Sequence, residues 1–234
     1  MTTTSDAWIE DWLSAGRFAT YLQAAGGSRV RALELYEWNA RLSAAFLRDI
    51  SHLEVGLRNA CDRQLQAATT GGDTHWTDPA TLMRLFPAAS RFDRAKGRRI
   101  DVNKNPRDKV ERAREAGTAS PGIAVPSPAP LPGKTIAELM FGFWTFLFAD
   151  GHEKTLWVPY LHRAFPPGTD RSRLSQTLTA IREFRNRIAH HENILKGSEI
   201  ERRRIVSATQ MLSPELAAHC QATSEVSAIL SKRP

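Results

Sequence analysis

The sequence predicts an all-α protein built as one helical bundle. Long stretches without proline place apolar residues at helical spacing, and signals that start and stop helices flank them. No stretch alternates apolar and polar residues as a strand would. The chain has 234 residues, of which 41% are hydrophobic and 24% charged, which is typical of one soluble domain. We expect a composite domain in which residues 1–70 and 135–234 form the bundle and residues 71–134 are an insertion.

Two helices are expected in the amino-terminal part. The first begins at a cap on Ser5 or Asp6 and ends at the pair Gly26 and Gly27. Its apolar residues Trp8, Ile9, Trp12 and Leu13 share one face. The second lies between residues 29 and 68, which include no proline, and is either one long helix or a helix with one break. Its apolar residues recur at intervals of three, four and six, namely Leu33, Tyr36, Leu42, Phe46, Ile50, Leu53 and Leu57.

Residues 71–134 have a different composition from the parts that flank them. A short helix is expected from Pro79 to Leu85. Between Arg94 and Arg114, nine lysines and arginines stand against three acids, a surplus of six in a chain whose net charge is +7. Five prolines between residues 121 and 132 exclude a helix there and predict an extended loop. The insertion is therefore basic and proline-rich.

The carboxy-terminal part is expected to be helical throughout. Residues 136–149 are an apolar run with aromatic residues on all sides, which is typical of a centrally buried helix. The next helix is expected to begin at Thr169 or Asp170 and to end at Lys196. Two further amphipathic helices follow from Glu199, separated near Pro214.

The cysteines and the apolar runs disfavour a disulfide framework, a thiolate metal site and a membrane-spanning helix. Cys61 and Cys220 lie far apart without CxxC spacing, so we expect two buried free thiols. The longest apolar run is shorter than the roughly 20 residues that span a bilayer. We therefore expect a cytoplasmic protein without a membrane partner.

The stretch REFRNRIAHHENIL, residues 182–195, lies on the helix expected to end at Lys196. At 100° per residue, Asn186 and His190 lie about 40° apart in a polar stripe, almost opposite the core-facing Ile188. His191 leans toward the apolar side. Adjacent residues of a helix cannot converge on one ion, and no HExxH or distant cysteine and histidine set completes a site, so no metal is expected.

Arginine, asparagine and histidine side chains together suit cleavage of RNA by its own 2′-hydroxyl. A histidine titrates near neutrality and can move a proton, while a guanidinium stabilises the charge that develops on a phosphate. This reaction requires no cofactor. The alternative is that Arg185, Asn186 and His190 form only an exposed polar face.

The heptapeptide RNRIAHH, residues 185–191, resembles the R-N-x-x-A-H-H signature of the abortive-infection (Abi-like) family, part of the HEPN superfamily of all-helical ribonucleases. HLEVGLRN, residues 52–59, resembles the amino-terminal E-x-x-x-R helix of that family. LMFGFWTFL, residues 139–147, resembles its central apolar helix with an embedded glycine. The resemblance covers residues 15–230 and implies a HEPN-like bundle.

The resemblance implies a role for each motif residue. Arg185 and His190 would be the catalytic pair, with Asn186 in support. His191 matches a second family histidine that is either structural or assists. Glu54 and Arg58 match the amino-terminal helix. From their spacing, we expect these two to form an i,i+4 ion pair that braces the motif helix. Arg187 departs from the family pattern, which has an apolar residue there.

The sequence thus predicts a metal-independent HEPN endoribonuclease that acts in phage defence or as a toxin. HEPN active sites usually pair two motif helices and this chain has one motif, so a homodimer is expected. An antitoxin protein or a regulatory RNA would be a further partner. The basic segment is either a solvated surface or a guide for RNA phosphates through Arg98, Arg99, Lys104 and Arg107. The alternative function is a non-catalytic module that holds RNA or a nucleotide under the control of a partner.

Overall fold

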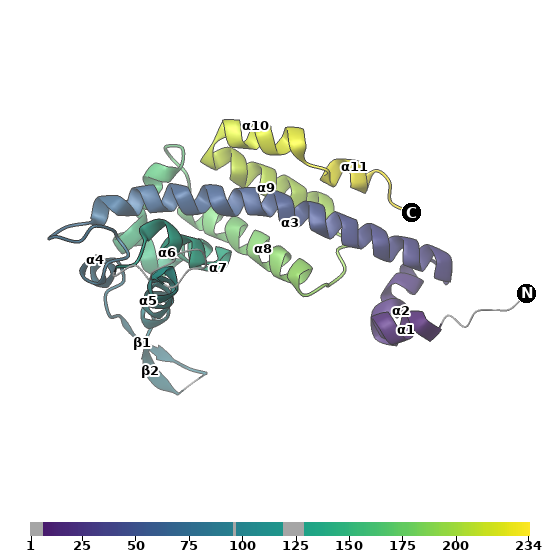
Figure 1. The fold of residues 1–234 in the computed structure, drawn as a ribbon, viewed down its shortest axis with the longest axis horizontal. Helices are drawn as coiled ribbons and strands as arrows, with labels where there is room; N and C mark the ends of the chain where they lie inside the picture. The colour runs from purple at the N-terminus through teal and green to yellow at the C-terminus, as the bar shows by residue number, and fades with distance from the viewer. Residues whose placement is uncertain (1–6, 96, 119–128) are drawn as a thin grey trace, which may run out of the picture.

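The computed structural model describes residues 7–95, 97–118 and 129–234 (Figure 1). These residues are mostly helical, which confirms the all-α class apart from one small hairpin. The α-helices are α1 (Ala7–Leu13), α2 (Ala15–Ala24), α3 (Arg29–Leu65), α4 (Pro79–Leu85), α5 (Lys104–Thr118), α6 (Pro132–Glu138), α7 (Phe141–Phe146), α8 (Arg171–Ala189), α9 (Ser198–Leu212), α10 (Pro214–Thr223) and α11 (Val226–Leu230). The expected loop at residues 121–128 and the expected caps Ser5 and Asp6 lie outside the described residues.

Helix α3 is the central element of the fold. It runs unbroken through 37 residues, about 55 Å at 1.5 Å per residue. Ser28 caps it, because its hydroxyl accepts a hydrogen bond from the Arg31 amide at 3.4 Å. Helices α8 to α11 follow its length in Figure 1. An edge-to-face contact between Phe46 and Phe184, with ring centroids 4.9 Å apart, joins α3 to α8.

The prediction of a single amino-terminal helix up to Gly26 is wrong, because the helix breaks at Ser14. Ser14 takes a positive φ of 64° and accepts a hydrogen bond from the Arg17 amide, so it ends α1 and caps α2. Ile9 and Leu13 are buried, whereas Trp8 and Trp12 remain 52% and 53% exposed. The four apolar residues of α1 therefore do not share one environment.

The apolar run at residues 136–149 does not form one helix. It divides into α6 and α7 at Leu139 and Met140, which have extended backbones. The break is stabilised by the Trp144 indole, which donates to the Leu139 carbonyl at 2.8 Å, while the aromatic residues on both sides stay buried. Shorter turns follow α7, namely 3₁₀ turns at Asp150–His152 and Leu161–Ala164 and a π turn at Glu153–Trp157.

A two-stranded hairpin in the basic segment overturns the expectation that no strand is present. Strand β1 (Ser90–Asp93) pairs antiparallel with β2 (Arg98–Asp101). Each strand has four residues and neither face is buried, so no alternation of apolar and polar residues marks it in the sequence.

The short helix predicted from Pro79 to Leu85 is confirmed as α4.

Helix α8 begins as expected and ends earlier than expected. The Asp170 carboxylate accepts a hydrogen bond from the Arg173 amide at 3.0 Å and caps the first turn. The helix ends at Ala189, not at Lys196. Beyond Gly197 the chain forms α9, α10 and α11, one helix more than predicted, with Pro214 at the start of α10.

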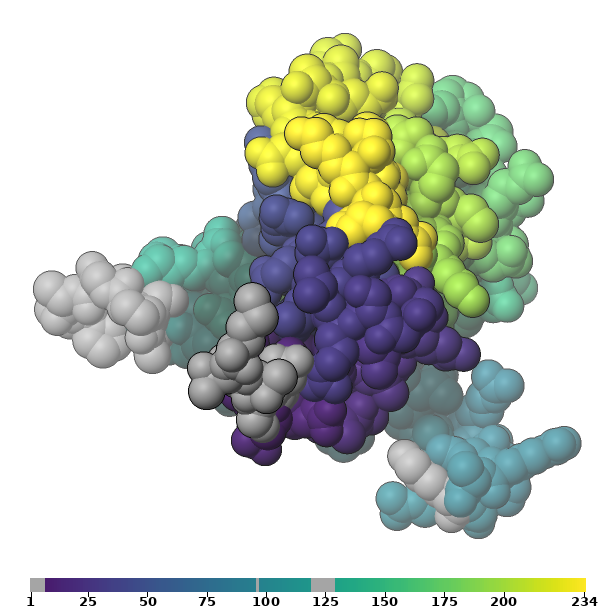
Figure 2. All heavy atoms as spheres, turned by 90° about the vertical axis from the view of Figure 1, so that its right-hand side faces the viewer, coloured from purple at the N-terminus to yellow at the C-terminus, as the bar shows by residue number. Residues whose placement is uncertain are grey.

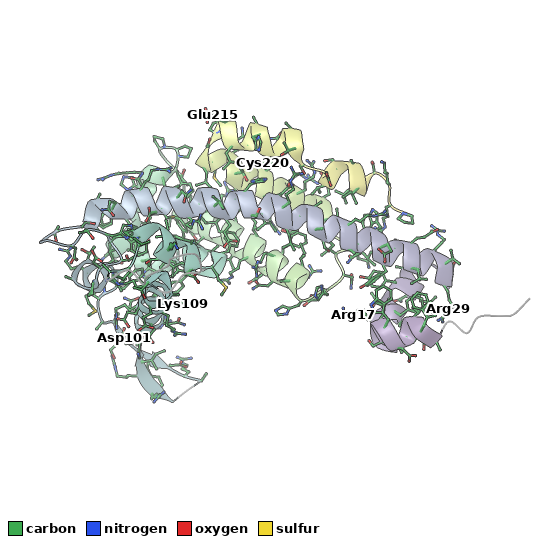
Figure 3. The ribbon with its side chains drawn as sticks, in the orientation of Figure 1. Arg17, Arg29, Asp101, Lys109, Glu215 and Cys220 are labelled. Atoms are coloured by element: carbon green, nitrogen blue, oxygen red, sulfur yellow. The ribbon has the colours of Figure 1, made fainter. Side chains whose placement is uncertain are left out.

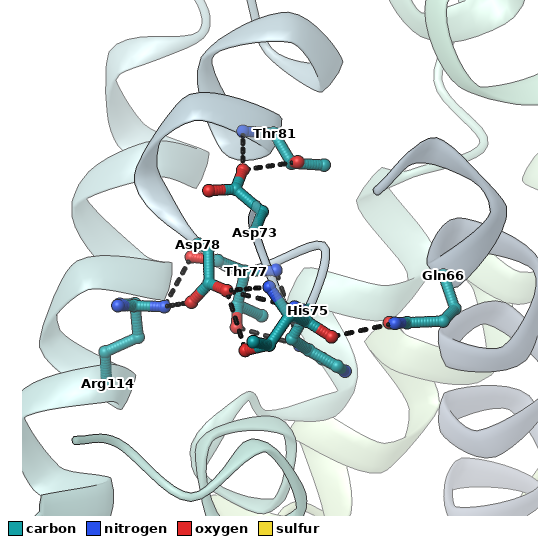
Figure 4. Close-up of polar contacts among 8 residues, drawn as sticks. Gln66, Asp73, His75, Thr77, Asp78, Thr81 and Arg114 are labelled. Carbon is teal, nitrogen blue, oxygen red and sulfur yellow. Dashed lines mark hydrogen bonds and ion pairs between the residues drawn. The ribbon is translucent and has the colours of Figure 1, made fainter. Parts of the chain in front are cut away.

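Polar contacts hold the beginning of the insertion, and Figure 4 shows those that join Gln66, just past α3, residues 73–81 and Arg114. The buried Trp76 donates its indole N–H to Asp62 of α3 at 2.7 Å, and His75 Nε2 lies 3.1 Å from the same carboxylate. Arg114 of α5 forms an ion pair with Asp78, whose second oxygen accepts bonds from nearby amides. The insertion is therefore packed onto the bundle at this end.

The two cysteines differ in burial. Cys61 is buried as expected, and burial raises the pKa of its thiol, whereas Cys220 is partly exposed. Both are free thiols. Within the described part of the chain, no helix combines the length and the apolar character that crossing a bilayer would require.

The pKa of Asp78 makes the stability of this region depend on acid. Burial raises this pKa, but hydrogen bonds from Arg114 and from the amides of His75 and Thr74 outweigh burial and lower it from 3.8 to about 2. A folded pKa below the unfolded one means that ionised Asp78 stabilises the fold above about pH 4 and loses this contribution as the pH falls through about 2. We expect Asp78→Asn to lower the free energy of unfolding at neutral pH by about 1 to 3 kcal/mol.

Urea unfolding between pH 7 and pH 2 measures this effect. The decline in stability below pH 4 should be shallower in Asp78→Asn than in wild type. Asp11→Asn, on the exposed side of α1, is the control and should match wild type. Equal stability of Asp78→Asn and wild type at every pH would contradict the assignment.

Candidate active site

The three motif side chains lie on the last turn of α8 and at its end. Arg185 is half-buried, and Asn186 and His190 are exposed. Among the described residues, none forms a hydrogen bond with the side chain of Asn186 or His190. Their polar ends therefore face solvent and are available to a ligand.

A Schellman turn ends α8 at the motif. His190 is the last residue near helical geometry, and His191 has a left-handed φ of 56°. The His191 amide donates to Ile188 and the Glu192 amide donates to Arg187, both at 2.9 Å. Glycine usually takes the left-handed position, and a side chain there costs about 1 to 2 kcal/mol. The expectation that His191 leans toward the core is wrong, because the turn leaves it exposed.

The segment after the turn is held at three points. Arg187 donates to the Asn193 carbonyl at 2.8 Å and lies 3.3 Å from the Glu192 carboxylate. The buried Asn39 of α3 accepts a hydrogen bond from the Ile194 amide at 2.8 Å. Arg187, which departs from the family pattern, thus closes the turn. Neither this role nor that of Asn39 was predicted.

Glu54 of α3 lies next to Arg185. Burial raises the pKa of Glu54, while the Arg185 guanidinium, a hydrogen bond from the Phe141 amide and the Arg58 guanidinium all oppose that rise. The carboxylate therefore meets both the first turn of α7 and the motif arginine. Helices α3, α7 and α8 converge at this carboxylate, which favours a bracing role for Glu54.

The ion pair expected between Glu54 and Arg58 does not form within the described residues. Arg58 instead donates to its neighbour Asn59 at 3.4 Å. Gly142, the glycine embedded in the apolar segment, faces the motif helix, since a Cβ there would lie 3.7 Å from the Arg182 side chain. An alanine would fit at this position, and a longer side chain would meet Arg182.

A hollow of about 220 Å³ lies beside the turn. The carboxy-terminal end of the motif contributes one wall and α2 contributes the other, and the lining residues are Arg17, Thr20, Tyr21, Arg187, His191, Glu192 and Asn193. Figure 3 shows Arg17 on the side of α2 toward the end of α8. Burial, together with Tyr36 and against the opposing charge of Arg17, raises the pKa of Tyr21 to about 12. The α2 residues were missed because no pattern in the sequence links them to the motif.

The four basic residues predicted to bind RNA differ in their exposure and in whether they are already paired with acidic residues. Arg98 and Arg99 lie exposed on β2. Lys104 is paired with Asp108 at 3.0 Å. Arg107 is 12% exposed, pairs with Asp101 and donates to the Phe86 carbonyl at 2.6 Å. We therefore assign Arg107 to the base of the hairpin, not to an RNA-contacting surface.

Comparison of the chain with protein-family models, with curated proteins and with solved structures finds no match. The family resemblance thus rests on the residues of this chain alone and stays a prediction. Within the described ranges, no group of three or more histidine, cysteine, aspartate or glutamate side chains is arranged to hold a metal ion.

The left-handed φ of His191 predicts the effect of glycine at this position. We expect His191→Gly to raise the free energy of unfolding by about 1 kcal/mol, because glycine adopts this backbone without steric cost. His190→Gly is the matched control, since His190 has a φ of −89° and offers no strain to relieve. Thermal or urea unfolding measures both variants. A His191→Gly protein no more stable than His190→Gly would show that the turn is unstrained.

Proposed function

We propose that this chain is a metal-independent endoribonuclease of the HEPN type. The observation that supports it most is the placement of Arg185, Asn186 and His190 at the exposed end of α8, with the polar ends of Asn186 and His190 unpaired. The left-handed backbone of His191 beside this set is a second supporting observation. Strained turns of non-glycine residues are concentrated at functional sites.

The proposed reaction is an internal transesterification of RNA. The 2′-hydroxyl loses its proton and its oxygen attacks the adjacent phosphorus, and the bond from phosphorus to the 5′-oxygen breaks. The leaving 5′-oxygen takes up a proton, so the products are a 2′,3′-cyclic phosphate and a 5′-hydroxyl. His190 would transfer one of these protons, and Arg185 would bind the phosphoryl oxygens as their charge increases.

The neighbours of the motif have supporting roles in this proposal. Glu54 contacts the Phe141 amide and the charge of Arg185, and so would orient the guanidinium. Asn186 would orient the phosphate or the histidine. His191 lies at the hollow with Arg17 and Tyr21, where a nucleotide flanking the cleaved bond would fit.

The reaction needs one group that accepts a proton and another that donates one. His190 supplies one such group per chain, while His191 is turned to the hollow. A second copy of the chain would supply the other histidine across a two-fold axis. A homodimer with a shared site is therefore part of the proposal, as is a cytoplasmic role in phage defence or as a toxin restrained by an antitoxin protein or RNA.

The competing function is a non-catalytic module that binds RNA or a nucleotide through the same face. The exposed arginines would serve either function. The intact set of Arg185, Asn186 and His190 favours the enzyme over the binding module. The two functions are distinguished by whether RNA is cut and by the ends that the products carry.

The chemistry predicts specific ends on the RNA products. Mass spectrometry of products from a defined oligonucleotide should find 2′,3′-cyclic phosphate and 5′-hydroxyl ends. A substrate with a single 2′-deoxy nucleotide 5′ to the cut should resist at that bond, because the nucleophile is missing, and should be cut normally elsewhere. Cleavage of the deoxy-substituted bond at the normal rate would exclude attack by the 2′-hydroxyl.

The shared site predicts that activity depends on both chains. An Arg185→Ala, His190→Ala double mutant in excess should exchange into dimers with wild type and lower the activity per wild-type chain. Native mass spectrometry confirms subunit exchange. An Arg203→Ala protein, altered on the exposed side of α9, is the control and should leave activity unchanged. Full activity of wild-type chains in confirmed heterodimers, or a stable monomer as active as the dimer, would contradict the shared site.

A further inference from the structure

The β1–β2 hairpin projects from the molecule and is held firmly at its base. Figure 2 shows it standing clear of the helices. At the base, the Asp101 carboxylate accepts hydrogen bonds from the amides of Ala89 and Asn103, each at 3.0 Å, and pairs with Arg107. The Asn103 side chain donates to the Pro87 carbonyl at 2.8 Å. The hairpin is thus a fixed arm, and not a loop that lies on the surface.

One face of the hairpin combines an aromatic ring with a guanidinium. Phe92 and Arg99 are opposite each other in the strand register, so their side chains lie on the same face. Phe92 is 55% exposed. The Arg99 Nε donates to the Ser90 hydroxyl at 2.9 Å, which fixes the guanidinium on that face. A flat ring and a flat cation are therefore presented side by side to solvent.

The rest of the hairpin is strongly basic. Arg91, Arg94 and Arg98 form no ion pair or side-chain hydrogen bond with the described residues. A hollow of about 830 Å³ lies against both strands and includes Arg91 and Arg94 in its lining. Because neighbouring residues of a strand alternate faces, Arg91 and Arg98 project from the face opposite to Phe92. The hairpin therefore offers unpaired cations on one face and a ring with a guanidinium on the other. A single strand of RNA supplies phosphates for the first and bases for the second.

We infer that this hairpin is a nucleobase-stacking arm, in which Phe92 and Arg99 receive an unpaired base while Arg91, Arg94 and Arg98 bind the phosphates on either side of it. A base in a duplex is already stacked on both sides, so such an arm selects single-stranded RNA. This deepens the proposed ribonuclease by naming the class of its substrate, and it rests on that function for its biological meaning. RNA binding by the arm can nevertheless be measured without cleavage.

Two other occupants of the hairpin fit its features less well. A second copy of the chain would bring the same unpaired arginines together, and repulsion would oppose that contact. An anionic lipid surface would accept the charges, but it offers no flat ring to pair with Phe92 and Arg99. Both are tested as outcomes below.

The experiment measures binding in the full-length His190→Ala protein, so that the RNA stays intact. A labelled single-stranded oligonucleotide and a blunt duplex of the same length are titrated in fluorescence anisotropy at several salt concentrations. Phe92→Ala should weaken binding of the single strand roughly tenfold, in line with the loss of one stacked base, and should leave duplex binding unchanged. Phe92→Trp should restore wild-type affinity. Replacing Arg91, Arg94 and Arg98 by glutamine should instead flatten the salt dependence for both RNAs.

Met83→Ala is the matched control, because Met83 is 49% exposed on the neighbouring helix α4 and should not affect binding. The inference is overturned if Phe92→Ala binds the single strand like its parent, or if it loses duplex affinity to the same extent. It is also overturned if the variant changes only self-association or only binding to phosphatidylserine vesicles. Cleavage by the wild-type protein separates the two proposals. If Phe92→Ala weakens binding but the wild-type protein cuts no RNA, only the proposed ribonuclease function is contradicted. If the wild-type protein cuts RNA but Phe92→Ala binds normally, only the proposed stacking arm is contradicted.

Discussion

The candidate site depends on where α8 stops. The helix ends at Ala189, with His190 as its cap, because His191 adopts a left-handed backbone and the amides of His191 and Glu192 turn back onto the carbonyls of Ile188 and Arg187. Had the helix continued, His190 would sit within a regular stripe and the chain could not approach α2. The stop leaves His190 exposed and places His191 at the hollow beside α2. The strain at His191 is offset by the contacts of the segment that follows, above all the buried bond from Ile194 to Asn39.

One helix, α3, connects the separate parts of this arrangement. Asn39 holds the segment after the turn, Glu54 meets Arg185 and the start of α7, and Asp62 receives the indole of Trp76 at the beginning of the insertion. These residues lie along a single unbroken helix, and Asn39 is buried on the core-facing side of it. The motif and the base of the insertion are therefore positioned by the same scaffold, and the hairpin is carried at a fixed place relative to the motif.

The sequence was informative where one local rule decides the structure and uninformative where distant residues decide it. The absence of proline and the apolar spacing predicted the helical stretch of α3 but left a break within it open, and Asp170 marked the start of α8. The end of α8 was missed because histidine, not glycine, occupies the left-handed position. The break at Ser14 and the division of α6 from α7 are stabilised by local bonds, from the Arg17 amide and the Trp144 indole, that helical spacing does not predict. Arg107 was a candidate for contact with RNA because its partner Asp101 could not be inferred from their spacing. The roles of Asn39, Arg17 and Tyr21 arise only from the packing of α2 and α3 around the turn.

We propose that the turn at the end of α8 is the catalytic centre of a ribonuclease that needs no metal. Incubation of the purified protein with a mixed pool of cellular RNA in excess EDTA tests it most directly, with His190→Ala and Arg185→Ala proteins of confirmed fold alongside. Wild type should cut the RNA in EDTA, and both variants should lose nearly all of this activity. Intact RNA with the wild-type protein, or equal cleavage by wild type and His190→Ala, would contradict it.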